Sequence, residues 1–291
     1  MTAFGIQGSG QLVGGAPDPG VFREVAVRAE DLGYDSIWAG DHISYRNPIL
    51  DVVVALSTFA AVTSRITVAA GIVLLPLRHP SVVAKEFASL DYASGGRTIL
   101  GVGVGGESGP DFDAVGVSPR ERGPRTDDAI RALRALFSER PASYEGRFFS
   151  FAGISIEPPP TQPGGPPLWV GGRSEAAIRR AATLGDGWIP IWVSAERFRD
   201  DAATLPDKVV PAVTLPAHVG EKRKLYEHLR RRYAGDFSEH VVDRYCVAGT
   251  PDECAARVRE YVEAGAQHIV FNLGECEDAE RLAEVARAAA G

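Results

Sequence analysis

The chain has 291 residues, of which 45% are hydrophobic, and it carries a formal net charge of −7. This length fits one large α/β domain, and the negative charge argues against a nucleic-acid partner. No apolar run is long enough to span a membrane, and the N-terminal residues lack the basic start and apolar core of a signal peptide. The three cysteines match no metal-binding spacing. We therefore expect a cytoplasmic protein whose partner is a small molecule.

Short apolar runs alternate with amphipathic helical patterns along the chain. Strands are predicted at residues 3–7, 36–39, 66–75, 98–104, 168–170, 187–191, 209–214 and 268–273. Helices are predicted at residues 19–33, 51–63, 81–94, 125–137, 174–184, 195–203, 221–233, 250–264 and 278–290. Ser81 is the expected cap of the third helix, and Thr250 to Glu253 form a capping box. The Pro-rich segment 142–165 is expected to be a loop with a short hairpin at 147–156.

Strands that alternate with helices along a chain pair in parallel through right-handed crossovers. Eight such units predict an α/β fold, a closed (β/α)8 TIM barrel with insertion segments. No change of composition marks a second domain, so we expect residues 1–291 to form a single barrel domain. A doubly wound open sheet is the alternative.

The stretch TILGVGVGGESG contains Gly101, Gly103 and Gly106 in the G-x-G-x-x-G spacing of dinucleotide-binding proteins. That fingerprint requires a helix to begin directly after the glycines. Prolines and further glycines follow here, and no helix is predicted before about Arg125, so we disfavour a Rossmann site. At the end of a barrel strand, glycines such as Gly103 and Gly105 instead let a flat ligand approach the backbone. A tight turn is the alternative explanation.

Polar residues also follow the second and third predicted strands. Asp41 and His42 come directly after the second strand, where ligand-binding residues of a barrel lie. Such a pair can exchange protons or position a hydrogen bond, although loop capping is the alternative. Arg78 follows the third strand and either meets an anion or forms an ion pair within the loop.

The fifth predicted strand is followed by Gly171, Gly172, Arg173 and Ser174, immediately before a helix. Free backbone N–H groups and the positive end of a helix dipole favour a phosphate group at this place, and an ordinary helix cap at Ser174 is the alternative. The histidines show no metal-binding spacing, and no serine-nucleophile motif is present. The strand ends therefore suit a phosphorylated planar cofactor better than a metal or a covalent nucleophile.

These residues lie within segments that resemble the luciferase-like monooxygenase superfamily, and within it the coenzyme F420-dependent oxidoreductases. The matching segments, in family order, are LGYDSIWAGDH, GIVLLPLRHPSVVAKEFASLDYASGGRTILGVGVGGE, FDAVGVSPRERGPRTDDAIRAL, PLWVGGRSEAAIRRAATLGDGWIP and GTPDECAARVREYVEAGAQHIVF. Together they span most of the chain from residue 32 to residue 271, whereas residues 194–245 match only loosely.

The resemblance implies a deazaflavin (coenzyme F420), or alternatively the flavin FMN, lying across the mouth of the barrel. In this family a cis peptide bond without proline supports the ring, and it corresponds here to Gly71–Ile72, next to Val73. The ring-contacting pair of the family corresponds to Asp41 and His42. The other implied cofactor-binding residues are Gly103, Val104, Gly105, Gly171, Gly172, Arg173 and Ser174.

One departure from the family concerns the catalytic acid. Sugar-phosphate dehydrogenases of the family carry it directly after G-V-G-x-G, where this chain has Gly106, with Glu107 one position later. We predict an F420-dependent oxidoreductase that transfers a hydride between the deazaflavin C5 and a small organic substrate that the sequence does not identify. His42 is the expected proton donor or acceptor, Asp41 is expected to orient it, and Glu107 is a second catalytic candidate.

Two other functions stay open: a monooxygenase that uses reduced FMN, and a flavin-binding protein without catalysis. Family relatives often form dimers, so a homodimer is expected. Trp188, Trp192 and Phe112 either line a partly apolar substrate pocket or serve only for packing.

Overall fold

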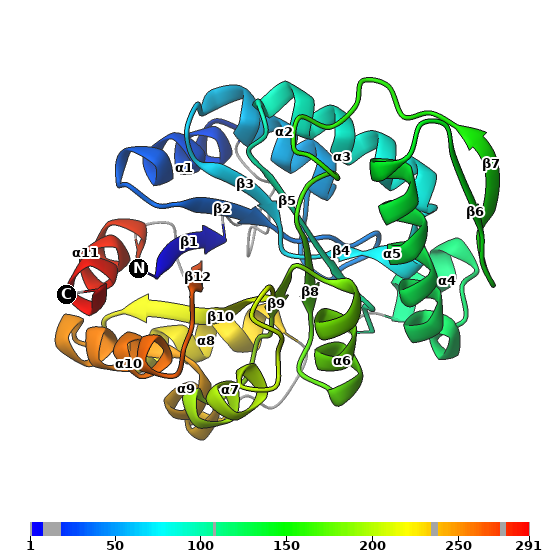
Figure 1. Cartoon of the computed structure of the whole chain (residues 1–291). Coiled ribbons are helices and arrows are strands. Elements are labelled where there is room, and N and C mark those ends of the chain that lie inside the picture. The colour runs from blue at the N-terminus through cyan, green and yellow to red at the C-terminus, as the bar shows by residue number, and fades with distance from the viewer. Residues whose placement is uncertain (1, 8–18, 107–108, 234–237, 274–277, 291) are drawn as a thin grey trace.

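The computed structural model describes residues 2–7, 19–106, 109–233, 238–273 and 278–290. Eight parallel strands form a closed barrel, and helices surround it (Figure 1). In ring order the strands are β1 (Ala3–Gln7), β2 (Ser36–Ala39), β3 (Thr67–Ala70) with β4 (Val73–Leu74), β5 (Thr98–Gly103), β8 (Leu168–Gly171), β9 (Gly187–Ile189), β10 (Val210–Val219) and β12 (His268–Leu273). The pairing of β12 with β1 and of β9 with β10 closes the ring, which confirms the predicted TIM barrel.

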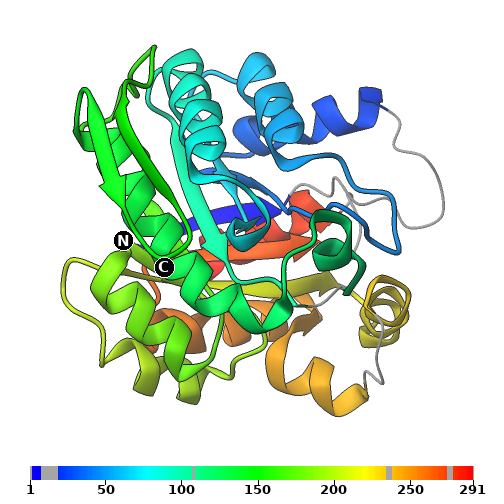
Figure 2. The ribbon, with the colours of Figure 1, turned by 90° about the vertical axis from the view of Figure 1, so that its right-hand side faces the viewer.

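The helices lie outside the strands, as the perpendicular view also shows (Figure 2). They are α1 (Pro19–Asp31), α2 (Val52–Val62), α3 (Pro80–Ser94), α4 (Gly109–Val115), α5 (Arg122–Ser138), α6 (Glu175–Leu184), α7 (Ala195–Ala202), α8 (Lys222–Arg232), α9 (Glu239–Tyr245), α10 (Pro251–Glu263) and α11 (Asp278–Ala290). The hairpin of β6 (Ala142–Glu145) and β7 (Ser150–Ile154) stands outside the barrel beside α5, and β11 (Val247–Gly249) extends the end of β10 (Figure 1). No helix among the described residues is long and apolar enough to cross a membrane.

Among the local predictions that were wrong, three concern the segment from β3 to α5, and the hairpin expected at 147–156 begins earlier, at residue 142. The third strand is interrupted after residue 70, so it forms two short pieces, β3 and β4. His79 rather than Ser81 caps α3, because Pro80 occupies the first helical position and Ser81 lies inside the first turn. The segment expected to be irregular before Arg125 contains α4, whose buried Phe112 packs against apolar residues near the end of β4.

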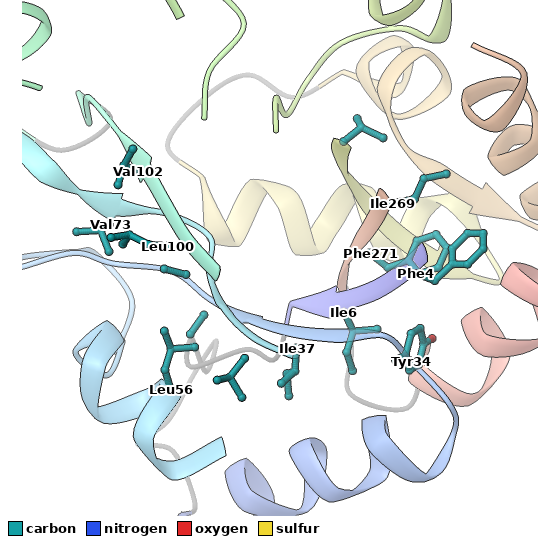
Figure 3. Close-up of a cluster of buried hydrophobic side chains, with 14 of the residues drawn as sticks. Phe4, Ile6, Tyr34, Ile37, Leu56, Val73, Leu100, Val102, Ile269 and Phe271 are labelled. Carbon is teal, nitrogen blue, oxygen red and sulfur yellow. The ribbon is translucent and has the colours of Figure 1, made fainter. Parts of the chain in front are cut away.

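The main hydrophobic core lies between the strands and the surrounding helices. Ile6 of β1 and Ile37 of β2 point outward into the same buried layer as Leu56 of α2, and all three side chains are fully buried (Figure 3). Burying a side chain of this size contributes roughly 2 kcal/mol, so this layer stabilises the packing of the helices on the strands.

A second, smaller cluster fills the inside of the barrel. Trp38 and Trp169 stand 5.4 Å apart between ring centroids, and His268 packs edge-on against both. Trp38 Nε1 donates a hydrogen bond to Ser36 Oγ at 2.7 Å, and Ser36 Oγ also lies 2.7 Å from His268 Nε2. Because Ser36 already accepts from the tryptophan, its hydroxyl proton is available to a neutral His268. Burial lowers the pKa of His268 to about 4.

This buried histidine makes the stability of the protein depend on pH. Unfolded histidine takes up a proton near its ordinary pKa of about 6.5, whereas folded His268 resists protonation down to about 4. Its contribution is therefore fully present above pH 6.5 and is lost as the pH falls toward 4, by up to about 3 kcal/mol. Urea unfolding across this range should show a smaller loss of stability for His268→Gln than for the natural chain. His240→Gln, which removes an exposed histidine of α9, is the control, and equal pH dependence in all three proteins would contradict the assignment.

Candidate active site

A cavity of about 240 Å³ opens at the carboxyl ends of the barrel strands. Every barrel strand contributes to its wall, either directly or through the loop that follows the strand. The lining residues are Gln7, Trp38, Gly40, Asp41, His42, Tyr45, Gly71, Ile72, Leu74, Val104, Gly105, Gly171, Gly172, Ile189, Ile191, Thr214, Arg232, Tyr233, Val270 and Asn272. Since its polar groups are few and converge on an apolar floor, the cavity has the composition of a cofactor or substrate site.

Most of the predicted site residues meet at this cavity. Asp41, His42, Gly71, Ile72, Val104, Gly105, Gly171 and Gly172 line it. Val73 is fully buried behind the wall, and Gly103, Arg173 and Ser174 are not among the lining residues. Glu107 lies outside the described residues.

The Gly71–Ile72 peptide bond is cis, as the family resemblance predicted. It stands at the interruption between β3 and β4, so the backbone of both residues faces the cavity. The side-chain amide of Gln7, at the end of β1, donates to the carbonyl oxygen of Gly71 at 3.4 Å. This hydrogen bond crosses the mouth of the barrel and fixes one polar side chain beside the cis bond.

The glycines of β5 make room for the backbone of Ala70 and the side chain of Ile72. A Cβ atom on Gly103 would lie 1.8 Å from Cδ1 of Ile72, and one on Gly171 would lie 2.8 Å from the same atom. A Cβ atom on Gly101 would lie 2.1 Å from the carbonyl oxygen of Ala70. The side chain of Ile72 occupies the space beside Gly103, and contact of Gly103 with a cofactor stays a prediction. Gly105 does face the cavity, with a positive φ of 65° that favours glycine.

His42 is oriented by Asp111 and not by Asp41. Its Nδ1 atom lies 2.7 Å from Oδ2 of Asp111, a buried carboxylate on α4. The other carboxylate oxygen accepts from the backbone N–H groups of Ile43 and Ser44 at 2.8 and 2.7 Å. An ionised carboxylate can only accept, so Nδ1 carries the proton and a neutral His42 keeps its lone pair on Nε2. The ring also stacks on Tyr45 at a centroid distance of 4.0 Å.

Asp41 instead forms an ion pair that supports the loops. Its carboxylate accepts from Arg78 Nη2 at 2.7 Å and from the backbone N–H of Leu74 at 3.0 Å. The same Arg78 nitrogen donates to Asp51 at 2.7 Å. Burial alone would lower the pKa of Arg78, but the two carboxylates outweigh it and raise that pKa. Of the two interpretations of Arg78, the loop ion pair is the one observed.

The loop after β8 has the form of an ordinary helix start. The Ser174 hydroxyl accepts from the backbone N–H of Ala177 at 3.2 Å and so caps α6. Arg173 is exposed and donates to the carbonyl oxygen of Trp192 at 2.7 Å. Phosphate binding here stays a prediction, supported by Gly171 and Gly172 at the cavity wall.

The polar residues of the site that sequence reasoning missed include Gln7, Asp111, Arg232 and Asn272. Gln7 and Asn272 sit at the ends of β1 and β12, so the strand-end rule could have found them. Asp111 and Arg232 lie on helices, and only the folded chain places them at the site, so no strand-end pattern marks them. Two of the aromatic residues considered for the pocket serve for packing, because Trp188 stacks on Phe198 and Phe112 is buried in an apolar cluster.

Comparison with known proteins decides the family, because the model of the luciferase-like monooxygenase family matches residues 2–208. The chain belongs to the luciferase-like monooxygenase family. This confirms the resemblance seen in the strand-end segments.

Curated relatives of this family align with almost the whole chain. The F420-dependent glucose-6-phosphate dehydrogenase of Amycolatopsis mediterranei is 28% identical over 334 residues, covering 97% of this chain and 95% of the relative. The enzyme of the same name from Kineococcus radiotolerans is 28% identical over 297 residues, covering 87% of each chain.

Solved structures share the fold at lower identity. An F420-dependent secondary alcohol dehydrogenase with an F420-acetone adduct superimposes with a TM-score of 0.86 at 20% identity, covering 99% of both chains. The coenzyme F420-dependent tetrahydromethanopterin reductase of Methanopyrus kandleri has a TM-score of 0.77 at 20% identity, covering 97% of both chains. At these identities the likeness concerns the fold alone.

The contact of Asp111 with His42 predicts a specific effect of Asp111→Asn. If the amide oxygen stays on the two backbone N–H groups, the amide nitrogen must donate to Nδ1 and force the proton onto Nε2. Nitrogen-15 NMR of histidine-labelled protein should show this change of tautomer at His42. Asp113→Asn, on the exposed side of the same helix, should leave the spectrum unchanged. An unaltered His42 signal in Asp111→Asn would contradict the assignment.

The contact of Gly103 with Ile72 predicts that Gly103→Ala is harmful. The added methyl group would overlap Cδ1 of Ile72 and should lower the free energy of unfolding by about 1–3 kcal/mol. A second change, Ile72→Val, removes Cδ1 and should recover part of the loss in a double-mutant cycle measured by urea unfolding. Gly109→Ala is the control, because no atom lies within 4 Å of a Cβ built there. Additive effects of the two changes would show that the contact is not the cause.

Proposed function

We propose that this protein is an F420-dependent oxidoreductase that transfers a hydride between the deazaflavin C5 and a small organic substrate. The observation that supports it most is the alignment of nearly the whole chain with F420-dependent glucose-6-phosphate dehydrogenases. The names of the structural neighbours agree with the predicted cofactor. Glucose 6-phosphate itself is not carried over, because Gly106 replaces the catalytic acid of the sugar-phosphate enzymes.

The cavity fits a planar cofactor with a phosphorylated side chain. Trp38 and Val270 give it an apolar floor, and the backbone of Gly71, Ile72 and Gly105 forms a wall with few protruding side chains. A Cβ atom on Gly71 would lie 3.0 Å from the Trp38 ring, so a larger residue there would disturb this wall. These residues, with Val104, would hold the ring, and Gly171, Gly172 and Ser174 would hold the phosphate.

When bound, coenzyme F420 supplies the carbon that gives or accepts the hydride. The protein would contribute position, exclusion of water and proton transfer. His42 lines the cavity with Nδ1 fixed on Asp111, so its Nε2 can accept a proton from a substrate hydroxyl or return one to a carbonyl. Glu107 is the second candidate for this role. The expected homodimer and cytoplasmic location belong to this proposal as well.

Binding of coenzyme F420 and of FMN to the purified protein, side by side, tests the cofactor. We expect F420 to bind at least about tenfold more tightly, which is about 1.4 kcal/mol. The reverse preference would favour the FMN-dependent monooxygenase and call for oxygen-consumption assays. Failure of both cofactors to bind would contradict the proposal.

Single-turnover reduction of bound F420, with a panel of secondary alcohols as hydride donors, tests the proton-transfer residue. His42→Ala should slow the step by about 100-fold or more, whereas F420 affinity should change little. Glu107→Gln tests the second candidate in the same way. Unchanged rates in both variants would remove the two residues from the mechanism, and F420 binding without turnover of any substrate would favour a protein that only binds the cofactor.

A further inference from the structure

Arg232, the last residue of α8, forms part of the cavity wall although it is a charged side chain only 4% exposed to solvent. Its Nη1 donates to Oδ1 of Asn272 at 2.7 Å. Its Nε is buried and has no hydrogen-bond partner. The backbone oxygen of Arg232 accepts from Tyr45 and Asn47, so the residue is held in place independently of its guanidinium group.

The absence of a counter-charge distinguishes Arg232 from another buried arginine of the barrel. Arg180, 7% exposed, forms an ion pair with Asp127. No carboxylate of the described residues forms such a pair with Arg232, and its hydrogen-bonding side chain, Asn272, is neutral. Burying a cation without a counter-charge is unfavourable, so a group of this kind is expected to meet an anion that enters the cavity.

The positive charge of Arg232 affects the pKa of His228, which lies on the same helix, α8. Burial, followed by the charges of Arg232 and Arg231, lowers the pKa of His228 to about 4. A neutral His228 cannot add a second positive charge at this wall. Among the described lining residues, Arg232 is the one arginine or lysine, and the neutral amides of Asn272 and Gln7 line the same cavity.

The place of Arg232 in the barrel separates it from the glycine-lined wall. Its partner Asn272 is the second-last residue of β12, which stands opposite β5 in the ring of eight strands. The backbone of Ile72, Val104 and Gly105, which the proposed cofactor would occupy, lies on the β3–β5 side. Arg232 is thus available to the second molecule in the cavity, the substrate.

We propose that Arg232 and Asn272 form a receptor for a singly charged oxygen anion, a carboxylate carried by a small, otherwise apolar substrate. Carboxylate geometry matches the two-pronged guanidinium donor, and one cation with neutral amides balances one negative charge. A phosphate dianion would require further cations at the same wall. The identity of the ligand as a substrate rests on the proposed function, whereas its binding can be measured separately.

Titration calorimetry with benzoate tests the receptor, with benzamide as the uncharged probe of the same shape. Benzoate should bind the natural chain more tightly than benzamide, and Arg232→Gln should weaken benzoate by about 10- to 100-fold while leaving benzamide unaffected. Arg230→Gln, an exposed arginine of the same helix, should bind benzoate like the natural chain. Equal affinity of Arg232→Gln and the natural chain for benzoate would overturn the proposal, and so would tighter binding of inorganic phosphate than of benzoate.

Asn272→Asp gives a second test that does not remove the buried arginine. The new carboxylate would stand where Oδ1 accepts from Arg232, so it should supply the missing counter-charge. We expect a higher melting temperature and loss of benzoate binding. A lower melting temperature with intact benzoate binding would show that Arg232 does not need an anion, even if Arg232→Gln fails to fold.

Measurement of F420 affinity in the same variants separates this inference from the proposed function. F420 binding that survives in Arg232→Gln while benzoate binding is lost supports both. F420 binding without any benzoate binding overturns the receptor alone. Loss of F420 affinity in Arg232→Gln would assign Arg232 to the cofactor and overturn the receptor. Benzoate binding in a protein that does not bind F420 would support the receptor and contradict the proposed function.

Discussion

The side chain of Ile72 fills the space where β5 and β8 would otherwise carry side chains of their own. This contact determines several features at once. It requires glycine at positions 103 and 171, and it holds the residue after the cis bond against the neighbouring strands. The backbone between β3 and β4 therefore faces the cavity as a continuous wall. This packing contributes to the flat surface available to a ligand, and Gly171 both accommodates Ile72 and lines the cavity.

A second constraint connects the loop after β2 to a helix that follows β5. The buried carboxylate of Asp111 accepts three hydrogen bonds, one from the ring of His42 and two from the loop backbone. Replacing any of these donors would leave part of a buried charge unsatisfied, which is costly. Since Phe112 anchors the same helix in an apolar cluster, the orientation of His42 is fixed by packing as well as by charge. The helix that carries Asp111 thereby becomes part of the site.

Patterns in the sequence predicted the features whose interactions join residues close together in the chain. The capping box at Thr250 and Glu253 formed as expected, because both hydrogen bonds lie within four residues. The strand-end rule placed His42 and Gly105 at the mouth of the barrel, and both line the cavity there, because a barrel gathers all strand ends at one mouth. Family resemblance, and not periodicity, predicted the cis bond at Gly71–Ile72.

Contacts between distant segments could not be predicted in this way. The adjacent pair Asp41 and His42 suggested a local interaction, yet each side chain pairs elsewhere, with Arg78 and Asp111 respectively. A sequence pattern cannot show which of several possible partners a side chain takes, because only folding brings distant partners together. Arg232 was missed because it lies in the segment where the family resemblance is weakest.

The polar groups of the cavity are distributed unevenly, and this asymmetry determines which groups of a ligand each side can contact. The β3–β5 side offers backbone and aliphatic side chains, which discriminate by shape and exclude water. The β12–β1 side carries the guanidinium of Arg232 and the amides of Asn272 and Gln7, which discriminate by charge and hydrogen bonding. In a cavity of low polarity, a fixed charge acts strongly on whatever lies beside it. The first side therefore selects a ligand group by its shape, and the second side selects one by its charge and its hydrogen bonds.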